Sequence, residues 1–145
     1  MVQKEVAERL VAQPGDDAYS FLTLAVAMHA KTSHLMTLEP GSFFPPPKVR
    51  SAVVVFEKRD PALTNDRDVV LRLISAAFRM RRKKLTNNLV SGEVTKEAAR
   101  EALSRASISI DARADDLTLA DYDRLTTIIG PDVVATIAAQ PTELP

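Results

Sequence analysis

The stretch that decides the fold is Gly41-Ser-Phe-Phe-Pro-Pro-Pro-Lys-Val-Arg-Ser-Ala-Val-Val-Val-Phe56. Its three consecutive prolines each fix the backbone φ angle and lack an N–H, so they form a stiff surface segment that cannot lie inside a sheet. Residues 52–56 are apolar and mostly β-branched, which predicts a strand buried on both faces. The stretch therefore predicts a rigid loop joined directly to the core of a sheet.

Two aromatic rings and a lysine flank the prolines of this loop. Phe43 and Phe44 precede the prolines, and Lys48 follows them. Loops held by a rigid scaffold commonly carry binding residues, and an aromatic ring can stack on a base that is flipped out or unpaired. We expect Phe43 and Phe44 to stack on a base and Lys48 to contact RNA beside them. The alternative is that both rings simply cap a core.

The residues before the loop predict two helices and a first strand. The apolar period over 2–13 predicts an amphipathic helix that has no capping residue before it, as though an upstream part preceded it. Residues 19–30 are apolar on nearly every side, which predicts a buried helix. Residues 32–39 predict a strand that pairs antiparallel with a strand over 50–58. Two strands cannot cover this much apolar surface, so self-association through an uncovered margin is expected.

The spacing of the apolar residues changes from that of a strand to that of a helix after residue 60, and this change predicts a second domain. Residues 61–65 read as a linker, and residues 66–80 repeat apolar side chains at helical spacing. Further helices are predicted over 95–104 and 119–129, the last opened by a short capping box. The final residues, 141–145, are expected to form a frayed tail.

The densest charge in the chain lies in residues 79–84, where five of six positions are cationic. We expect these residues to lie in a helix, where such neighbours would repel one another unless an anion offset them. Lys and Arg neutralise the phosphates of nucleic acids, and Asn side chains bond bases or sugars. The alternative is a solvated charged helix face. The residues expected to bind RNA or DNA are Arg79, Arg81, Arg82, Lys83, Lys84 and Asn87, with Asn88 beside them.

The composition narrows the function classes. The net charge of zero hides a split, because residues 61–92 hold seven Lys or Arg against two Asp or Glu, and residues 93–145 hold five against ten. The chain has no cysteine and two isolated histidines, so we expect no disulfide and no metal site. Its four glycines form no Gly-x-Gly pair, and no Ser-His-Asp set is present. No apolar run approaches the roughly 18 residues that span a membrane, and no signal peptide opens the chain, so a cytoplasmic protein is expected.

Three blocks of sequence carry a family resemblance. They are Met1-Val-Gln-Lys-Glu-Val-Ala-Glu-Arg-Leu10; Phe43-Phe-Pro-Pro-Pro-Lys-Val49 with Ser51-Ala-Val-Val54; and Ala77-Phe78, Arg81-Arg-Lys83, Leu85 and Asn87-Asn-Leu89. In order and spacing, to about residue 130, the chain resembles the KsgA-type small-subunit ribosomal RNA adenine dimethyltransferases. The resemblance implies an enzyme that uses S-adenosylmethionine to dimethylate N6 of two adjacent adenines in small-subunit rRNA, with the 30S-type subunit as partner. It also implies that the ring of Phe43 covers the target base.

The resemblance covers only the later part of such an enzyme. The family's glycine-rich cofactor motif, its acidic ribose-binding residue and its Asn-Leu-Pro-Tyr/Phe motif are absent from this chain. The fold class it implies is therefore an α/β remnant plus α. Residues 1–60 are expected to form the last strands and helices of a Rossmann-like methyltransferase sheet, and residues 61–145 a small helical rRNA-binding domain.

Several departures and alternatives accompany the resemblance. Arg50 stands where the family usually has Asp or Asn, and Lys84 and Thr86 replace the more usual Thr and Arg. We expect this chain alone to hold no complete catalytic site, to bind no cofactor and to be inactive. One alternative is a non-enzymatic nucleic-acid-binding or ribosome-docking module, as in related mitochondrial transcription factors. Another is an antibiotic-resistance methyltransferase that acts on large-subunit RNA.

Overall fold

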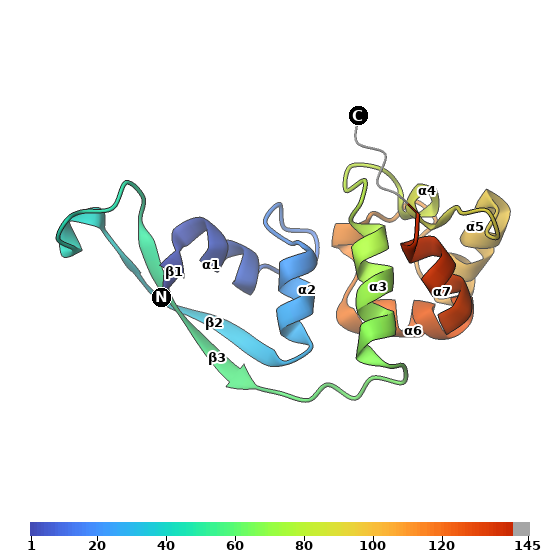
Figure 1. Cartoon of the computed structure of the whole chain (residues 1–145), viewed down its shortest axis with the longest axis horizontal. Helices are drawn as coiled ribbons and strands as arrows, with labels where there is room; N and C mark the ends of the chain where they lie inside the picture. The colour runs from blue at the N-terminus through green and yellow to red at the C-terminus, as the bar shows by residue number, and fades with distance from the viewer. Residues whose placement is uncertain (141–145) are drawn as a thin grey trace. The chain divides into compact units, whose positions relative to one another are not determined.

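The computed structural model describes residues 1–140, whose contacts form two compact units (Figure 1). The first unit runs from Met1 to Pro61, and the second begins at Ala62. The first contains a three-stranded sheet and two α-helices, whereas the described part of the second contains helices and turns. None of the helices within residues 1–140 is long and apolar enough to cross a membrane. The tail predicted for residues 141–145 lies outside the described residues.

An antiparallel sheet underlies the first unit. Strands β2 (Ala30–Leu38) and β3 (Ser51–Lys58) pair antiparallel, which confirms the predicted pair. The register shifts between His34 and Met36, where one extra residue forms a β-bulge. Strand β1 (Val2–Gln3) pairs with the other edge of β3, so the strand order is β1-β3-β2. The sequence does not predict β1, because its two residues also fit the helical period that follows.

Helices α1 (Lys4–Val11) and α2 (Phe21–Ala27) pack on this sheet. As expected from the missing capping residue, α1 begins without a side-chain hydrogen bond. Its last carbonyls are satisfied by two threonines. Thr23 donates to the carbonyl of Arg9 at 2.6 Å, and Thr32 donates to that of Leu10 at 2.5 Å. These two bonds join the end of α1 to α2 and to β2.

Several apolar side chains of the first unit are exposed, so the predictions of a strand buried on both faces and of a buried second helix are wrong for the described residues. Ala52 of β3 is fully buried, but Phe56 of the same strand is 51% exposed. Phe21 and Leu22 of α2 are exposed as well. The physical reason is that α1 and α2 cover only part of the sheet. The uncovered apolar margin is present as expected, and self-association through it stays a prediction.

The described part of the second unit contains five α-helices, whose bounds are α3 (Arg67–Ala77), α4 (Leu85–Leu89), α5 (Lys96–Arg105), α6 (Leu119–Ile129) and α7 (Pro131–Ala138). Helix α3 packs against α4, α6 and α7, and α5 packs against α4 and α6. Three helices begin at side-chain caps, as the side chains of Asp66, Thr95 and Thr118 accept first-turn N–H groups. The cap at Thr118 confirms the predicted start of α6. The large, fully buried core side chains include those of Val70, Leu73, Ile74, Leu85, Leu89, Leu103, Tyr122, Leu125, Val134 and Ile137.

Helix α3 ends at Ala77, three residues earlier than the predicted end of the helix over 66–80. Residues 78–83 form turns, and the N–H of Lys83 donates to the carbonyl of Met80 at 2.9 Å. The prediction that the cations at 79–84 lie in a helix is therefore wrong. Like charges three and four residues apart disfavour a continued helix, and the turn separates them.

A buried carboxylate on α6 holds the start of the second unit. Asp123 is 7% exposed, and its Oδ2 accepts the N–H of Thr64 at 2.8 Å. Its Oδ1 accepts the N–H of Asn65 at 3.0 Å and the Nδ2 of the same residue at 2.9 Å. Burial alone would raise the pKa of Asp123, but these donors outweigh it and hold the pKa below its ordinary value. Part of the predicted linker is therefore fixed to the helical core.

Candidate nucleic-acid interface

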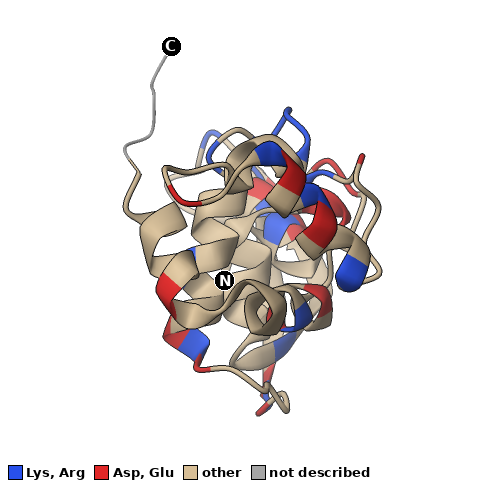
Figure 2. Ribbon diagram, turned by 90° about the vertical axis from the view of Figure 1, so that its right-hand side faces the viewer, with Lys and Arg blue, Asp and Glu red and all other residues tan. Residues whose placement is uncertain are grey.

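The cationic residues lie in the turn between α3 and α4, and we call residues 78–84 the cationic turn. Asn88 of α4, which is 4% exposed, holds this turn by its backbone. Its side-chain oxygen accepts the N–H of Met80 at 3.1 Å, and its side-chain nitrogen donates to the carbonyl of Met80 at 3.3 Å. The backbone is thus fixed while four cationic side chains stay exposed, namely those of Arg81, Arg82, Lys83 and Lys84. Figure 2 shows several Lys and Arg segments in the upper part of the view, with Asp and Glu segments among them.

The two asparagines after the turn have different environments. Asn87 is exposed, so its amide is accessible to a ligand. Asn88 is buried and bonds the backbone of the turn, so it shapes the site and is not available to a base. Its contribution to RNA binding would come through the position of its neighbours.

Arg79 differs from the other cations of the turn. Its guanidinium donates to the carbonyl of Ile137 and, at 3.1 Å, to that of Gln140. Both carbonyls lie at the C-terminal end of α7, where a cation is favourable. Burial lowers the pKa of Arg79 without removing its charge at neutral pH. Arg79 is therefore engaged in holding α7, and it is the least accessible of the cations predicted to bind RNA.

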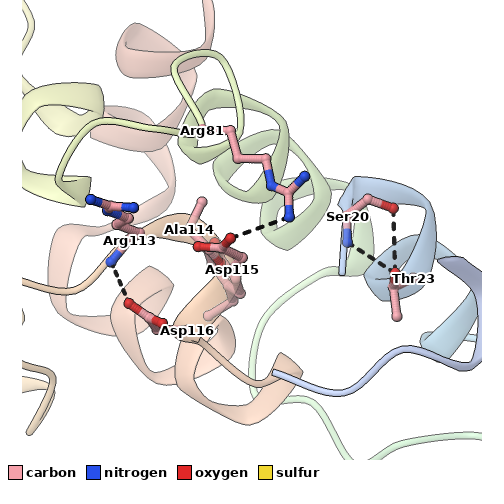
Figure 3. Close-up of polar contacts among 8 residues, drawn as sticks. Ser20, Thr23, Arg81, Arg113, Ala114, Asp115 and Asp116 are labelled. Atoms are coloured by element: carbon pink, nitrogen blue, oxygen red, sulfur yellow. Dashed lines mark hydrogen bonds and ion pairs between the residues drawn. The ribbon is translucent and has the colours of Figure 1, made fainter. Parts of the chain in front are cut away.

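Two exposed cations of the turn pair with carboxylates that follow α5. Nη2 of Arg81 lies 3.3 Å from Oδ2 of Asp115 (Figure 3), and Nζ of Lys84 lies 2.5 Å from Oδ1 of Asp111. The hydrogen bond from Lys84, followed by its charge, lowers the pKa of Asp111. The side chains of both pairs are in contact with solvent. Such pairs contribute little to stability, and each cation can exchange its carboxylate for another anion.

A hollow of about 440 Å³ lies beside the turn, and we call it the basic hollow. Its cations come from three segments: Arg82, Lys83 and Lys84 of the turn, Lys96 and Arg100 of α5, and Arg113 of the loop before the short 3-10 helix η2 (Ala114–Asp116). Asp111 is the carboxylate among the lining residues, which also include Asn87. The N–H of Leu85 donates to the carbonyl of Ala112 at 2.8 Å, which joins α4 to the loop that carries the last cation.

Three cations of the hollow were missed by the sequence prediction. Lys96 and Arg100 are four residues apart in a predicted helix, so their spacing was a signal that they share one face. Arg113 offers no such signal, because its position depends on the path of a loop. The sequence prediction therefore identified one wall of the hollow and missed the other.

The aromatic loop belongs to the first unit. It contains a short 3-10 helix, η1 (Pro40–Ser42), and a cis peptide bond between Phe44 and Pro45. Phe44 is 100% exposed and Phe43 is half-buried, so the alternative that both rings cap a core is wrong for Phe44. Lys48 is exposed as well. At the base of the loop, Nε of Arg50 lies 3.0 Å from Oε2 of Glu39, which joins its two ends.

The residues present do not fit a nucleotide-like cofactor such as S-adenosylmethionine. The four glycines form no Gly-x-Gly pair, the arrangement by which a glycine-rich loop lets the backbone approach such a ligand closely. The strands of the sheet pair antiparallel, whereas such cofactors bind at the carboxyl ends of parallel strands. Within residues 1–140, no group of three or more His, Cys, Asp or Glu side chains is placed to hold a metal ion.

Comparison with known proteins identifies the family. The model of the family described as ribosomal RNA adenine dimethylase matches residues 1–130. The chain belongs to the ribosomal RNA adenine dimethylase family. The resemblance found in the three sequence blocks is therefore confirmed.

Two curated relatives share the name ribosomal RNA small subunit methyltransferase A. The protein of Desulfitobacterium hafniense is 39% identical over 131 residues, which cover 89% of this chain and 47% of the relative. The protein of Xanthomonas oryzae is 41% identical over 130 residues, which cover 88% of this chain and 48% of the relative. The chain thus spans about half the length of the curated relatives it matches.

Two solved structures are similar to this chain. A dimethyladenosine transferase from Plasmodium falciparum is 25% identical, with a TM-score of 0.73 over 88% of this chain and 54% of that one. The 23S rRNA methyltransferase ErmE is 20% identical, with a TM-score of 0.54 over 87% of this chain and 51% of that one, and this likeness shows the fold alone. The small sheet and the helices of the chain are thus similar in fold to part of each of these two solved structures.

Proposed function

We propose that this chain is the C-terminal, RNA-recognising part of an S-adenosylmethionine-dependent rRNA adenine N6,N6-dimethyltransferase. The substrate is two adjacent adenines of small-subunit rRNA in the 30S-type subunit, and the enzyme acts in the cytoplasm. Residues 1–60 are the last section of its Rossmann-like methyltransferase sheet, and residues 61–145 are its rRNA-binding domain. The family assignment and the partial coverage of the relatives support this proposal.

The observation that carries the proposal is the exposed cationic turn, fixed by Asn88. Arg81, Arg82 and Lys83 project from a backbone that is hydrogen-bonded in place, which limits the entropy lost when they bind. Cations in such a position neutralise RNA phosphates and release counterions. The contacts are to the backbone, so they position the RNA and do not read its sequence.

The aromatic loop is proposed to contact the target base. Phe44 presents a fully exposed ring, and Phe43 lies half-buried before it. An extruded adenine can stack on such a ring, and Lys48 lies close by in the sequence to contact the adjoining phosphate.

RNA binding by the turn is tested with the triple variant Arg81→Ala, Arg82→Ala, Lys83→Ala. The probe is a fluorescent hairpin with the sequence of the 3′-terminal stem of small-subunit rRNA, titrated at several salt concentrations. Loss of three phosphate contacts should weaken binding at least tenfold and reduce the salt slope by about 2. The charge-matched control Lys31→Ala, Lys58→Ala, Arg72→Ala removes three exposed cations elsewhere and should change the affinity less than threefold. Equal effects of the two triple variants would contradict the proposal.

The chain alone is proposed to bind no S-adenosylmethionine and to be inactive, because it has no Gly-x-Gly pair and its strands pair antiparallel. We propose that the cofactor site of the enzyme lies in the part that corresponds to the uncovered part of the relatives. Isothermal titration calorimetry with S-adenosylmethionine should give no saturable heat. Stoichiometric binding would show that this chain contains a pocket for S-adenosylmethionine and would refute the proposal that the cofactor binds elsewhere in the enzyme.

A second candidate function is a nucleic-acid-binding or ribosome-docking module without catalysis. The exposed cationic turn and the exposed ring of Phe44 are features that such a module needs, and it needs no cofactor site. The coding sequence upstream of Met1 separates the two candidates. An intact glycine-rich motif followed by Asn-Leu-Pro-Tyr/Phe supports the enzyme, and decay of both motifs supports the binding module.

A further inference from the structure

A second hollow lies in the first unit, where the aromatic loop returns to the sheet. It has a volume of about 290 Å³, and we call it the neutral hollow. The end of β1, the beginning of α1 and the end of the loop line it with the side chains of Gln3, Lys4, Glu5, Glu8, Val49 and Arg50. Gln3 pairs in register with Ser51 of β3, and the N–H of Lys4 donates to the carbonyl of Arg50 at 3.0 Å. The backbone on both sides of the hollow is therefore fixed to the sheet.

The charges that line the neutral hollow balance one another. Two are cations and two are carboxylates. All four form ion pairs, which join Lys4 to Glu8 at 3.3 Å, Arg9 to Glu5 at 2.9 Å and Arg50 to Glu39 at 3.0 Å. The hollow thus offers no excess of charge to an ion, in contrast to the basic hollow. A neutral ligand suits it better than a phosphate does.

Two lining side chains are available to such a ligand. Gln3 is exposed, and within residues 1–140 its side-chain amide forms no hydrogen bond. Val49 is 49% exposed and presents an apolar surface. A ligand that matches both has an apolar face and an edge on which a donor lies beside an acceptor. A nucleobase has both features.

We infer that the neutral hollow binds the adenine that lies beside the target base in the RNA, with Gln3 as the residue that recognises it. This inference rests on the proposed function, in which the substrate has two adjacent adenines, and extends it. The amide oxygen of Gln3 accepts a hydrogen bond from N6 of adenine, and the amide NH2 group donates to N7. Guanine carries O6 in place of the N6 amine, so an acceptor would face the amide oxygen.

The position of the hollow suits a base next to the one on the aromatic loop. Val49 follows Phe44 by five residues, which span at most about 18 Å. The three prolines between them stiffen this connection. A volume of about 290 Å³ holds one base and leaves no room for a second ligand of that size. One short RNA segment can therefore reach both the ring of Phe44 and the neutral hollow.

The test is a double-mutant cycle with the whole chain and the hairpin probe. In a modified hairpin, both adjacent adenines are replaced by 7-deazaadenine, which keeps the ring that stacks on Phe44 but lacks the N7 acceptor. The wild-type chain should bind this hairpin about fivefold more weakly than the natural one. Gln3→Ala should bind the natural hairpin about tenfold more weakly than the wild-type chain does, and should bind the two hairpins within twofold of each other. A fivefold difference that persists in Gln3→Ala would overturn the inference, because another group would then bind N7.

Gln13→Ala is the matched control, since Gln13 is an exposed glutamine beyond the other end of α1 and does not line the hollow. It should bind the natural hairpin within twofold of the wild-type chain and keep the fivefold difference between the hairpins. Gln3→Glu keeps the shape of the side chain but has an acceptor where N7 needs a donor, so it should lose that difference. Circular dichroism checks that each variant keeps the helical content of the wild-type chain. Equal losses in Gln3→Ala and Gln13→Ala would overturn the inference.

Further outcomes separate this inference from its foundation and from a rival ligand. If the triple variant of the cationic turn weakens binding of the natural hairpin, but the wild-type chain binds both hairpins equally, this inference fails and the proposed function stands. If the wild-type chain binds no RNA, both fail. Free adenosine at the concentration of the hairpin should not displace it. Displacement would assign the hollow to a free nucleoside and overturn the inference.

Discussion

Replacement of Asp123 by Asn should destabilise the helical unit by about 2 kcal/mol. The carboxylate accepts three hydrogen bonds, at 2.8, 3.0 and 2.9 Å, from residues 64 and 65 while it is 7% exposed. An Asn of the same shape keeps one oxygen for the two donors of Asn65 but turns an NH2 group toward the N–H of Thr64. One charge-assisted bond is lost, worth about 1.5–3 kcal/mol, and a part-buried donor is left without a partner. Asp123→Ala loses all three bonds and should cost about 4 kcal/mol.

The same carboxylate makes stability depend on acid. The pKa of Asp123 is lower in the folded chain than in the unfolded one, so its stabilising contribution is complete above the unfolded pKa of about 4 and is lost as the pH falls through the folded pKa. The wild-type chain should therefore lose stability below about pH 4. Asp123→Asn should lose less over the same range, because it has no carboxylate to protonate.

Urea unfolding measures both effects. Circular dichroism gives the helical signal, and the amide signals of α6 in NMR spectra report the second unit separately. Glu101→Gln is the matched control, since Glu101 is exposed on α5 and its loss should change the free energy of unfolding by less than about 0.5 kcal/mol. If Asp123→Asn matched that control at pH 7 and kept the wild-type acid slope, the structural role of this carboxylate would be refuted.

Three shorter predictions concern single side chains. Asn88→Ala should lower the free energy of unfolding by about 2 kcal/mol, about 1 for each hydrogen bond to Met80, and should speed hydrogen exchange of the Met80 amide. If that amide kept its wild-type protection, the proposed role of Asn88 in holding the turn would be contradicted. Phe44→Ala should leave the free energy of unfolding unchanged within about 0.5 kcal/mol, because the ring is 100% exposed, but should weaken binding of the hairpin at least fivefold by loss of stacking. Phe56→Ala, which removes an exposed ring outside the loop, is its control and should leave RNA affinity unchanged. Thr118→Ala should lower stability by about 1 kcal/mol in urea unfolding, because the capping hydroxyl of α6 is lost; an effect below about 0.3 kcal/mol would contradict that role.

The spacing of the apolar residues along the sequence predicts most of the helices and strands. The antiparallel pair of strands and the start of α6 follow from apolar spacing, β-branched residues and a capping residue. The early end of α3 follows only in part, because the like charges disfavour a longer helix but the turn that replaces it is held by Asn88, which reaches back eight residues to the backbone of Met80. The burial of β3 also does not follow. An apolar pattern shows that the side chains of a strand can be buried. Whether they are buried depends on which elements pack over them, and Phe56 remains exposed.

The sequence locates only part of the candidate site. A local run of charge identifies the cationic turn. It does not predict that the guanidinium of Arg79 is hydrogen-bonded to carbonyls at the end of α7, because these follow Arg79 by about sixty residues. The opposite wall of the basic hollow combines a helix and a loop. A single sequence shows the spacing of Lys96 and Arg100, yet only the fold shows that they face the turn.

The central claim is that RNA binds the cationic turn and the aromatic loop of this chain. Its most direct test is an NMR titration of the isotopically labelled chain with the rRNA hairpin, which follows every backbone amide. We predict that the signals of residues 81–84 and 87, together with those around Phe44, shift progressively with added RNA. Shifts confined to α6 and α7, or no shifts at low salt, would contradict the account.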